Sequence, residues 1–199
     1  DLAADGVQVL ATEVMSLDQV QDVARVYETA TAGRRFPAPL VIAHINGIFD
    51  EYLAETAAAQ GADVQPDALG QASLLLGRKI CDYLRAAGNP HISYMAGGAR
   101  GLHHFTDWVG APGAVTINWG GTADKLLELD PPVTEVFRAP SSPMLVDELL
   151  AKMPDFHRAW TPGSLAREDY EAFGPVVKFR RQFEAGWQDA LDAVRGRRR

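Results

Sequence analysis

The sequence is poor in cysteine, in lysine and in long apolar runs. Its one cysteine, Cys81, cannot form a disulfide within the chain, and its apolar surroundings predict a buried, reduced thiol. No run approaches the roughly 18 apolar residues of a membrane-spanning helix. The sequence also opens without a basic segment followed by an apolar one. These absences predict a cytoplasmic protein with no membrane partner.

The chain also lacks an excess of positive charge. It has 19 Lys and Arg against 26 Asp and Glu, a formal net charge of -7 at pH 7. A nucleic-acid-binding protein needs a basic face for phosphate contacts, so we expect no nucleic-acid partner.

Metal and nucleotide motifs are missing as well. The five histidines show no HxH or HExxH spacing, and adjacent His103 and His104 on a helix would point about 100° apart. The glycine-rich stretch at 96–101, AGGARG, follows a predicted strand but lacks the GxGxxG and P-loop patterns. We therefore expect no metal site and no cofactor.

The 199 residues are 47% hydrophobic, enough for one sizeable core, and we interpret residues 1–199 as a single domain. Four short runs rich in β-formers stand out, and several are continuously apolar, as in parallel strands covered on both faces. The predicted strands are Val7 to Thr12, Pro39 to Ile45, His91 to Met95 and Ala114 to Asn118.

Each of these runs is followed by a segment with helical periodicity. Ser16 and Gln19 form a capping box at the start of the first helix, and Pro66 opens a longer helix that stops at Gly88. The resulting βαβαβαβα order predicts an α/β protein with a parallel sheet. Asp50 and Glu51 fall at the start of a helix, where the helix dipole favours carboxylates.

The C-terminal segment predicts one more amphipathic helix. Its apolar residues recur every three or four positions and form one wide face, so we expect the helix to pack on something large. They are Val176, Phe179, Phe183, Trp187, Ala190 and Val194.

Five segments, read in order, resemble one known family. They are GVQVLATEV at 6–14, PLVIAHINGIFD at 39–50, ISYMAGGAR at 92–100, GAVTINW at 113–119 and FRRQFEAGWQDAL at 179–191. They resemble strands five to eight and the final helix of the transaldolase and fructose-6-phosphate aldolase family. The resemblance implies a partial (β/α)8 TIM barrel, strands five to eight with their helices plus C-terminal helices.

The same resemblance implies a class I aldolase or transferase that acts on a ketose or related carbonyl compound. The family's Schiff-base lysine lies on the fourth strand, in the N-terminal half of the barrel, which this sequence does not contain. The four lysines here, Lys79, Lys125, Lys152 and Lys178, are all predicted on helices as surface charges. We therefore expect this chain alone to be inactive, and to oligomerise or associate with the missing half of the barrel.

Candidate site residues are those that close the predicted strands, since barrel active sites lie at the carboxyl ends of strands. Thr12, Asn46 and Asn118 offer hydrogen bonds to a substrate, and His44 stands where the family has an aromatic residue that holds a proton-transferring water. An imidazole can do that work at a pKa near neutrality. We expect Thr12, His44 and Asn118 to cluster.

Ser93 and Tyr94 are neighbours on the third strand, so only one of them faces the barrel interior. The residues do not say which.

Two cationic positions of the family are occupied by glycine. The family's phosphate-binding arginine aligns with Gly47, and a second cation aligns with Gly97. Arg100, in a glycine-rich loop, is a candidate replacement that binds substrate. The loss of the two family cations at positions 47 and 97 favours an unphosphorylated ketose or a more hydrophobic carbonyl compound over a sugar phosphate.

Two other readings stay open at this point. One is a non-catalytic barrel-type scaffold that binds a sugar-like ligand or a partner chain. The other is a doubly wound α/β enzyme of different chemistry, which the missing phosphate loop disfavours.

Overall fold

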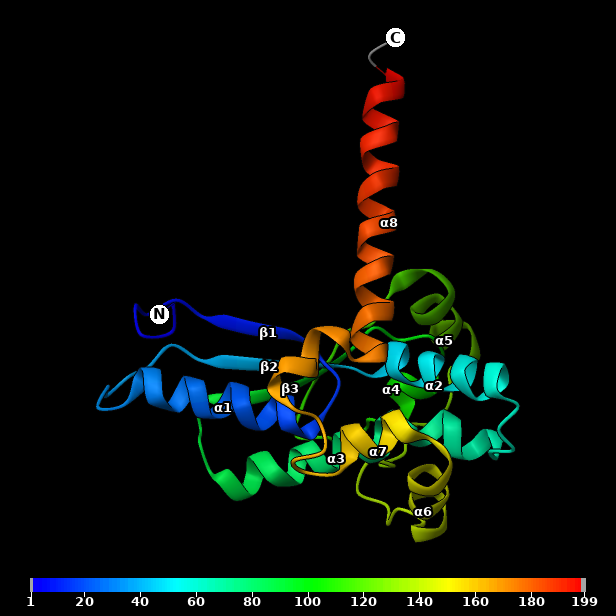
Figure 1. Cartoon of the computed structure of the whole chain (residues 1–199), viewed down its shortest axis with the longest axis horizontal. Coiled ribbons are helices and arrows are strands. Elements are labelled where there is room, and N and C mark those ends of the chain that lie inside the picture. The colour runs from blue at the N-terminus through cyan, green and yellow to red at the C-terminus, as the bar shows by residue number, and fades with distance from the viewer. Residues whose placement is uncertain (1, 198–199) are drawn as a thin grey trace.

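The computed structural model describes residues 2–197 and contains one four-stranded parallel sheet (Figure 1). The strands lie in sequence order, β1-β2-β3-β4, and every neighbouring pair is parallel. The prediction of four parallel strands is confirmed, with small shifts at the ends. The strands are β1 (Val9–Val14), β2 (Leu40–Ile45), β3 (Ile92–Gly97) and β4 (Gly113–Val115).

Helices follow each strand and then form the C-terminal third of the chain. The first three are α1 (Leu17–Thr31), α2 (Asn46–Gln60) and α3 (Pro66–Ala87). After β3 and β4 come α4 (His103–Thr106), the turn η1 (Trp119–Ala123) and α5 (Asp124–Leu129). The last elements are α6 (Pro143–Lys152), α7 (Pro154–Trp160), the 3-10 helix η2 (Arg167–Ala172) and α8 (Gly174–Arg197).

One face of the sheet is covered by helices. In Figure 1, α1 and α3 run along the same side of β1, β2 and β3. On that face Ile42 lies beside Tyr94, and both are buried. Gly77 of α3 sits so close that a side chain there would meet the Tyr94 hydroxyl at 2.9 Å. Tyr94 therefore faces the helices.

The opposite face carries the alternate residues and is bare along β1 and at Ser93, whereas Ala43 and Ile45 of β2 are buried. Val41 pairs with Ser93 in the parallel register, and Ser93 is exposed. Leu10 and Thr12 of β1 are exposed too, so the expected burial of both faces holds for β2 but is wrong for β1. Ser93, and not Tyr94, is on the face that would be the interior of a barrel.

Both edges of the sheet are open in the described part of the chain. The Val9 amide donates to the Pro39 carbonyl, so the amides of Leu10 and Thr12 point away from β2. Beside this edge an apolar groove of about 490 Å³ lies between β1 and α1, lined by Val9, Ala11 and Val23 among others. Residues 2–197 therefore form an open sheet and no closed barrel.

Helix α8 departs most from expectation. Its first turn is buried at Pro175 and Val176, but from Arg180 onward almost every residue is exposed. In Figure 1 it rises away from the rest of the chain. The expectation that its apolar face packs on something large is not met within the described residues. No helix in that part of the chain is both long and apolar enough to cross a membrane.

Candidate functional site at the carboxyl edge of the sheet

The first turn of α2 presses against the loop that follows β3. A Cβ atom on Gly47 would lie 2.1 Å from the Gly98 carbonyl oxygen and 2.8 Å from the Arg100 amide nitrogen. Both are backbone atoms, which cannot rotate aside. Position 47 is therefore closed to an arginine, such as the phosphate-binding one that the transaldolase family carries at the aligned position.

Arg100 is engaged by the protein itself. Its Nε donates to Glu51 at 3.2 Å, its Nη2 to Gln182 at 2.9 Å, and its Nη1 to the carbonyls of Gly98 and Ala99. Four of the five N–H groups of a guanidinium are thus used. Arg100 joins the β3–α4 loop to α2 and α8, which leaves it little capacity to bind a substrate anion.

His44 lies on the helix-covered face and is completely buried. Its Nδ1 is 2.9 Å from the Tyr94 hydroxyl, and its ring packs edge-on against Phe49 and Trp108. Burial, with a smaller contribution from His104, lowers the pKa of His44 to about 3. The predicted cluster of His44 with Thr12 and Asn118 is wrong, because His44 shares its face with Ile42 and Tyr94. This placement argues against a proton-transfer role for His44.

The other ring nitrogen of His44, Nε2, has no hydrogen-bond partner among the described residues. A buried polar atom without a partner costs about 1–3 kcal/mol. The imidazole is neutral at pH 7 and is held by packing and by one hydrogen bond.

This burial makes the stability of the fold depend on pH. The unfolded chain binds a proton at His44 below about pH 6.5, whereas the folded chain does not until about pH 3. The stability that depends on a neutral His44 is therefore fully present well above pH 6.5, and it is lost as the pH falls from 6.5 towards 3. Between pH 7.5 and pH 5 we expect the wild type to lose about 2 kcal/mol more stability than His44→Gln. Urea unfolding at the two pH values measures it, and an equal loss in both proteins would refute it.

The three remaining polar candidates, Thr12, Asn118 and Asn46, have different surroundings. Thr12 is exposed beside an irregularity in β1, where Glu13 has a φ of 60°. Asn118 is exposed and donates to the Ala99 carbonyl at 3.4 Å. Asn46 is buried at the start of α2, where its Oδ1 accepts from the Gly47 amide at 2.8 Å. Only Thr12 and Asn118 are accessible to a ligand.

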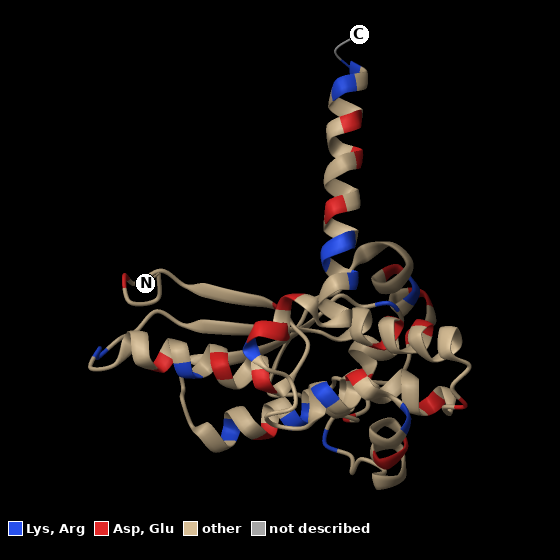
Figure 2. Cartoon of the chain, in the orientation of Figure 1, with Lys and Arg blue, Asp and Glu red and all other residues tan. Residues whose placement is uncertain are grey.

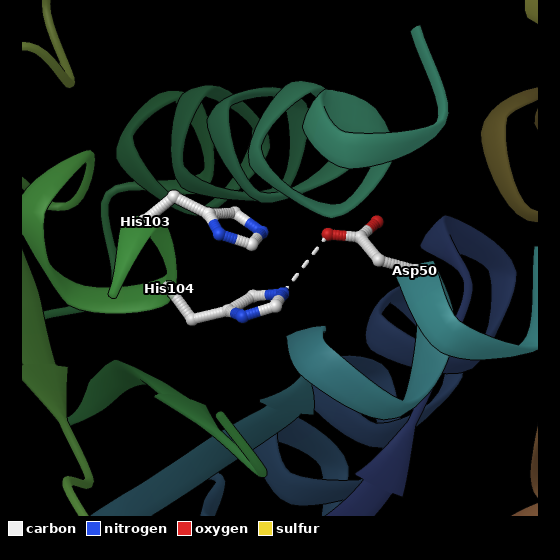
Figure 3. A group of neighbouring side chains, drawn as sticks. All are labelled: Asp50, His103 and His104. Atoms are coloured by element: carbon white, nitrogen blue, oxygen red, sulfur yellow. Dashed lines mark hydrogen bonds and ion pairs between the residues drawn. The ribbon is translucent and has the colours of Figure 1, made fainter. Parts of the chain in front are cut away.

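The sequence did not predict a cluster of buried Asp50, buried His104 and exposed His103 at this edge (Figure 3). Asp50 accepts from the Ser73 hydroxyl at 2.6 Å and the Ser73 amide at 2.7 Å, and its Oδ2 lies 3.1 Å from His104 Nε2. The rings of His103 and His104 lie with their centroids 3.9 Å apart and their planes tilted by 39°. The expected divergence of the two histidines is therefore wrong, because α4 is only four residues long.

The hydrogen bonds of His104 decide whether this cluster suits a metal. One ligand atom of each residue lies within 4.8 Å of the others, which a metal site would need. However, His104 Nδ1 accepts from the amides of Arg100 and Gly101 at 3.2 and 3.1 Å. Nδ1 therefore carries no proton, and Nε2 donates its proton to Asp50. A metal bound to Nε2 would require the proton to move to Nδ1, where it would face the two amide donors. These three residues therefore do not suit a metal ion.

The cluster instead ties three segments together. Asp50 joins α2 to α3 through Ser73 and to α4 through His104, and His104 in turn accepts from two amides of the β3–α4 loop. Burial raises the pKa of Asp50, while its hydrogen bonds act in the opposite direction. Partial burial also lowers the pKa of His103, which is exposed at its outer edge. This network fixes the loop next to the open face of the sheet.

All four lysines lie on helices, as predicted. Lys125 is on α5, Lys152 on α6 and Lys178 on α8, and the last two pair with glutamates. Lys79 on α3 differs from a surface charge, since its ammonium lies 4.2 Å from the centre of the Trp160 ring and burial lowers its pKa. None of the four is on a strand.

The chain matches no protein-family model, no curated protein and no solved structure in the three comparisons made.

Proposed function

We propose that this chain supplies four consecutive βα units of a transaldolase-like aldolase or transferase that acts on a ketose or related carbonyl compound. The strand order carries the proposal: four parallel strands follow one another in sequence, with the α1 and α3 helices on one face only. A (β/α)8 barrel has this order and this one-sided cover. A doubly wound sheet reverses its strand order and has helices on both faces.

The open edge at β1 supports the same proposal. The amides of Leu10 and Thr12, which point away from β2, and the apolar groove between β1 and α1 are what a preceding strand and its helix would cover. In the family, that preceding strand carries the Schiff-base lysine. We propose that another polypeptide segment or chain supplies this strand.

The substrate follows from the charges that the site lacks. Positions 47 and 97 are glycines, and Arg100 is already bound to Glu51, Gln182 and two carbonyls. Thr12 and Ser93 place hydroxyl groups on the bare face. This favours an unphosphorylated ketose or a more hydrophobic carbonyl compound, with Thr12 as a hydrogen-bonding residue for the substrate.

The first test is borohydride trapping of the purified chain with dihydroxyacetone or fructose, read by intact mass. Imine formation needs a neutral amine, and a lysine with a pKa of about 10.4 is neutral in fewer than about one molecule in a thousand at pH 7. We expect no stoichiometric adduct. Lys79→Arg is the control for the one half-buried lysine, and an adduct on Lys79, Lys125, Lys152 or Lys178 would refute the proposed source of the lysine.

The positive arm adds a separately produced first half of a transaldolase-family barrel that carries its own lysine. We expect a complex and an adduct on that added lysine, reduced about tenfold or more when Thr12 is replaced by valine. No gain in adduct over the added half alone would contradict the catalytic proposal.

A non-catalytic scaffold is the second candidate. One observation favours it: the polar side chains identified on the bare face, Thr12 and Ser93, are hydroxyls without an acid–base partner among the described residues. For this candidate the two halves should form a complex that binds the carbonyl compound without any trapped adduct.

A further inference from the structure

The outer stretch of α8, residues 180–197, lacks tertiary support. It contains 18 residues, about 27 Å of helix, and all but one of them are exposed. Isolated helices of about this length are marginal in water, because packing supplies most helical stability in proteins. A helix that remains folded here needs a partner surface.

The large apolar residues of this stretch lie on one face of the helix. Phe183, Trp187, Ala190 and Val194 are spaced by four, three and four, which places them on one seam of the helix. Asp189 and Asp192 lie off that seam. Phe183 is 60% exposed, Trp187 67% and Val194 52%, so the seam is open to solvent. Figure 2 shows acidic residues in the middle of α8 and basic ones near its base and tip.

The exposed area of the whole chain also exceeds that of a compact monomer. The chain exposes 11259 Å² at a mass of 21.6 kDa. A compact monomer of this mass exposes roughly 9,200 Å². The excess, about 2,000 Å², is more than the roughly 800 Å² that each partner buries in a standard interface.

We propose that α8 is a dimerisation helix, and that its outer stretch packs antiparallel along the same stretch of a second copy of this chain. The pairing places Trp187 opposite Ala190 of the second copy and Phe183 opposite Val194. Each layer then joins a large residue to a smaller one, the arrangement that fills a helix interface without voids. This inference is independent of the proposed enzymatic function.

Charge favours the antiparallel direction through one attractive pair, although this pairing also sets Arg180 level with Arg197 of the second copy. In that pairing Glu184 lies within one turn of Arg195 of the second copy, on the same flank of the seam, and the pair is attractive. A parallel pairing would set Trp187 against Trp187 and Ala190 against Ala190. It would also bring each charged residue to the level of its own copy.

Sedimentation velocity of the full chain from about 1 to 100 µM tests the dimer. We expect the wild type to reach twice 21.6 kDa, and Ala190→Glu to weaken dimerisation at least about 100-fold. Ala185→Glu is the matched control, because it makes the same change off the seam, and we expect less than about a threefold effect. A wild type that stays monomeric at 100 µM, or an equal loss in both variants, would overturn the proposal.

Direction is tested with two further variants, Glu184→Cys and Arg195→Cys. Buried Cys81 should stay silent in both. Both positions flank the seam, about 11 Å apart across an antiparallel pair, so the cross-linker is a bis-maleimide of about that span. An antiparallel pair is cross-linked only when the two variants are mixed. A cross-link of Glu184→Cys with itself, or no mixed cross-link in a dimeric sample, would overturn the antiparallel arrangement. This result does not depend on whether Ala190→Glu folds.

Discussion

Gly47→Ala is expected to destabilise the fold by roughly 3 kcal/mol or more. The new methyl group would lie 2.1 Å from the Gly98 carbonyl oxygen and 2.8 Å from the Arg100 amide. Since both are backbone atoms, α2 and the loop after β3 must move apart. That movement would also strain the hydrogen bond from the Gly47 amide to Asn46. Urea unfolding of the full chain measures the loss.

Gly70→Ala is the matched control for this prediction. Gly70 also lies in a helix, and a Cβ atom there meets nothing within 4 Å. Alanine is the better helix former by about 1 kcal/mol, so this variant should be as stable as the wild type or more stable. If Gly47→Ala were as stable as Gly70→Ala, the contact between α2 and the β3–α4 loop would be wrong.

His104→Ala should cost roughly 3 kcal/mol, because it removes a donor from the buried carboxylate of Asp50. It also leaves the amides of Arg100 and Gly101 without their acceptor. His103→Ala is the control one residue away. His103 is exposed at its edge and has no hydrogen bond to lose among those described, so we expect a change of about 0.5 kcal/mol.

Equal losses in the two histidine variants would contradict this account of the cluster. A metal site would give a different pattern, since both histidines would then be needed for tight binding of zinc. We expect added zinc to leave the unfolding midpoint of the wild type unchanged. A rise of several degrees that His103→Ala abolishes would show that the tautomer argument is wrong.

The order of the elements was predictable because it depends on local sequence. Short, continuously apolar runs between helical segments predicted four parallel strands. The predicted helix start is also present, since Ser16 accepts a hydrogen bond from the Gln19 amide at the start of α1. Pro66 does open α3, and Gly88 ends it in a left-handed conformation. These signals involve residues a few positions apart and need no knowledge of the tertiary structure.

The site was less predictable because it depends on which face each residue takes. Alternation along a strand places His44 and Ile45 on opposite faces but does not say which face the helices cover. The sequence therefore assigned His44 to the wrong side. Asp50, Ser73 and His104 meet from three elements that are far apart in sequence. The only signal for this cluster in the sequence was the position of Asp50 shortly after a strand end. That position was attributed to the helix dipole.

Helix α8 shows a third limit of the sequence. Its periodicity correctly predicted a long amphipathic helix, but a hydrophobic face does not identify the surface that covers it. The same holds for the open edge of β1. In both cases the sequence predicts the element, and only the structure shows that it lies exposed.

Thiol labelling of the two sheet faces tests the central claim, a sheet covered on one side only, most directly. Ser93→Cys places a thiol on the bare face and Ala96→Cys places one under the helices, where Ala96 is fully buried. Cys81 is buried, and burial raises its pKa to about 12, so it should not react. In the native chain we expect the thiol at position 93 to react with a maleimide at least about 100 times faster than the thiol at position 96. Equal protection at both positions would contradict the half-barrel account.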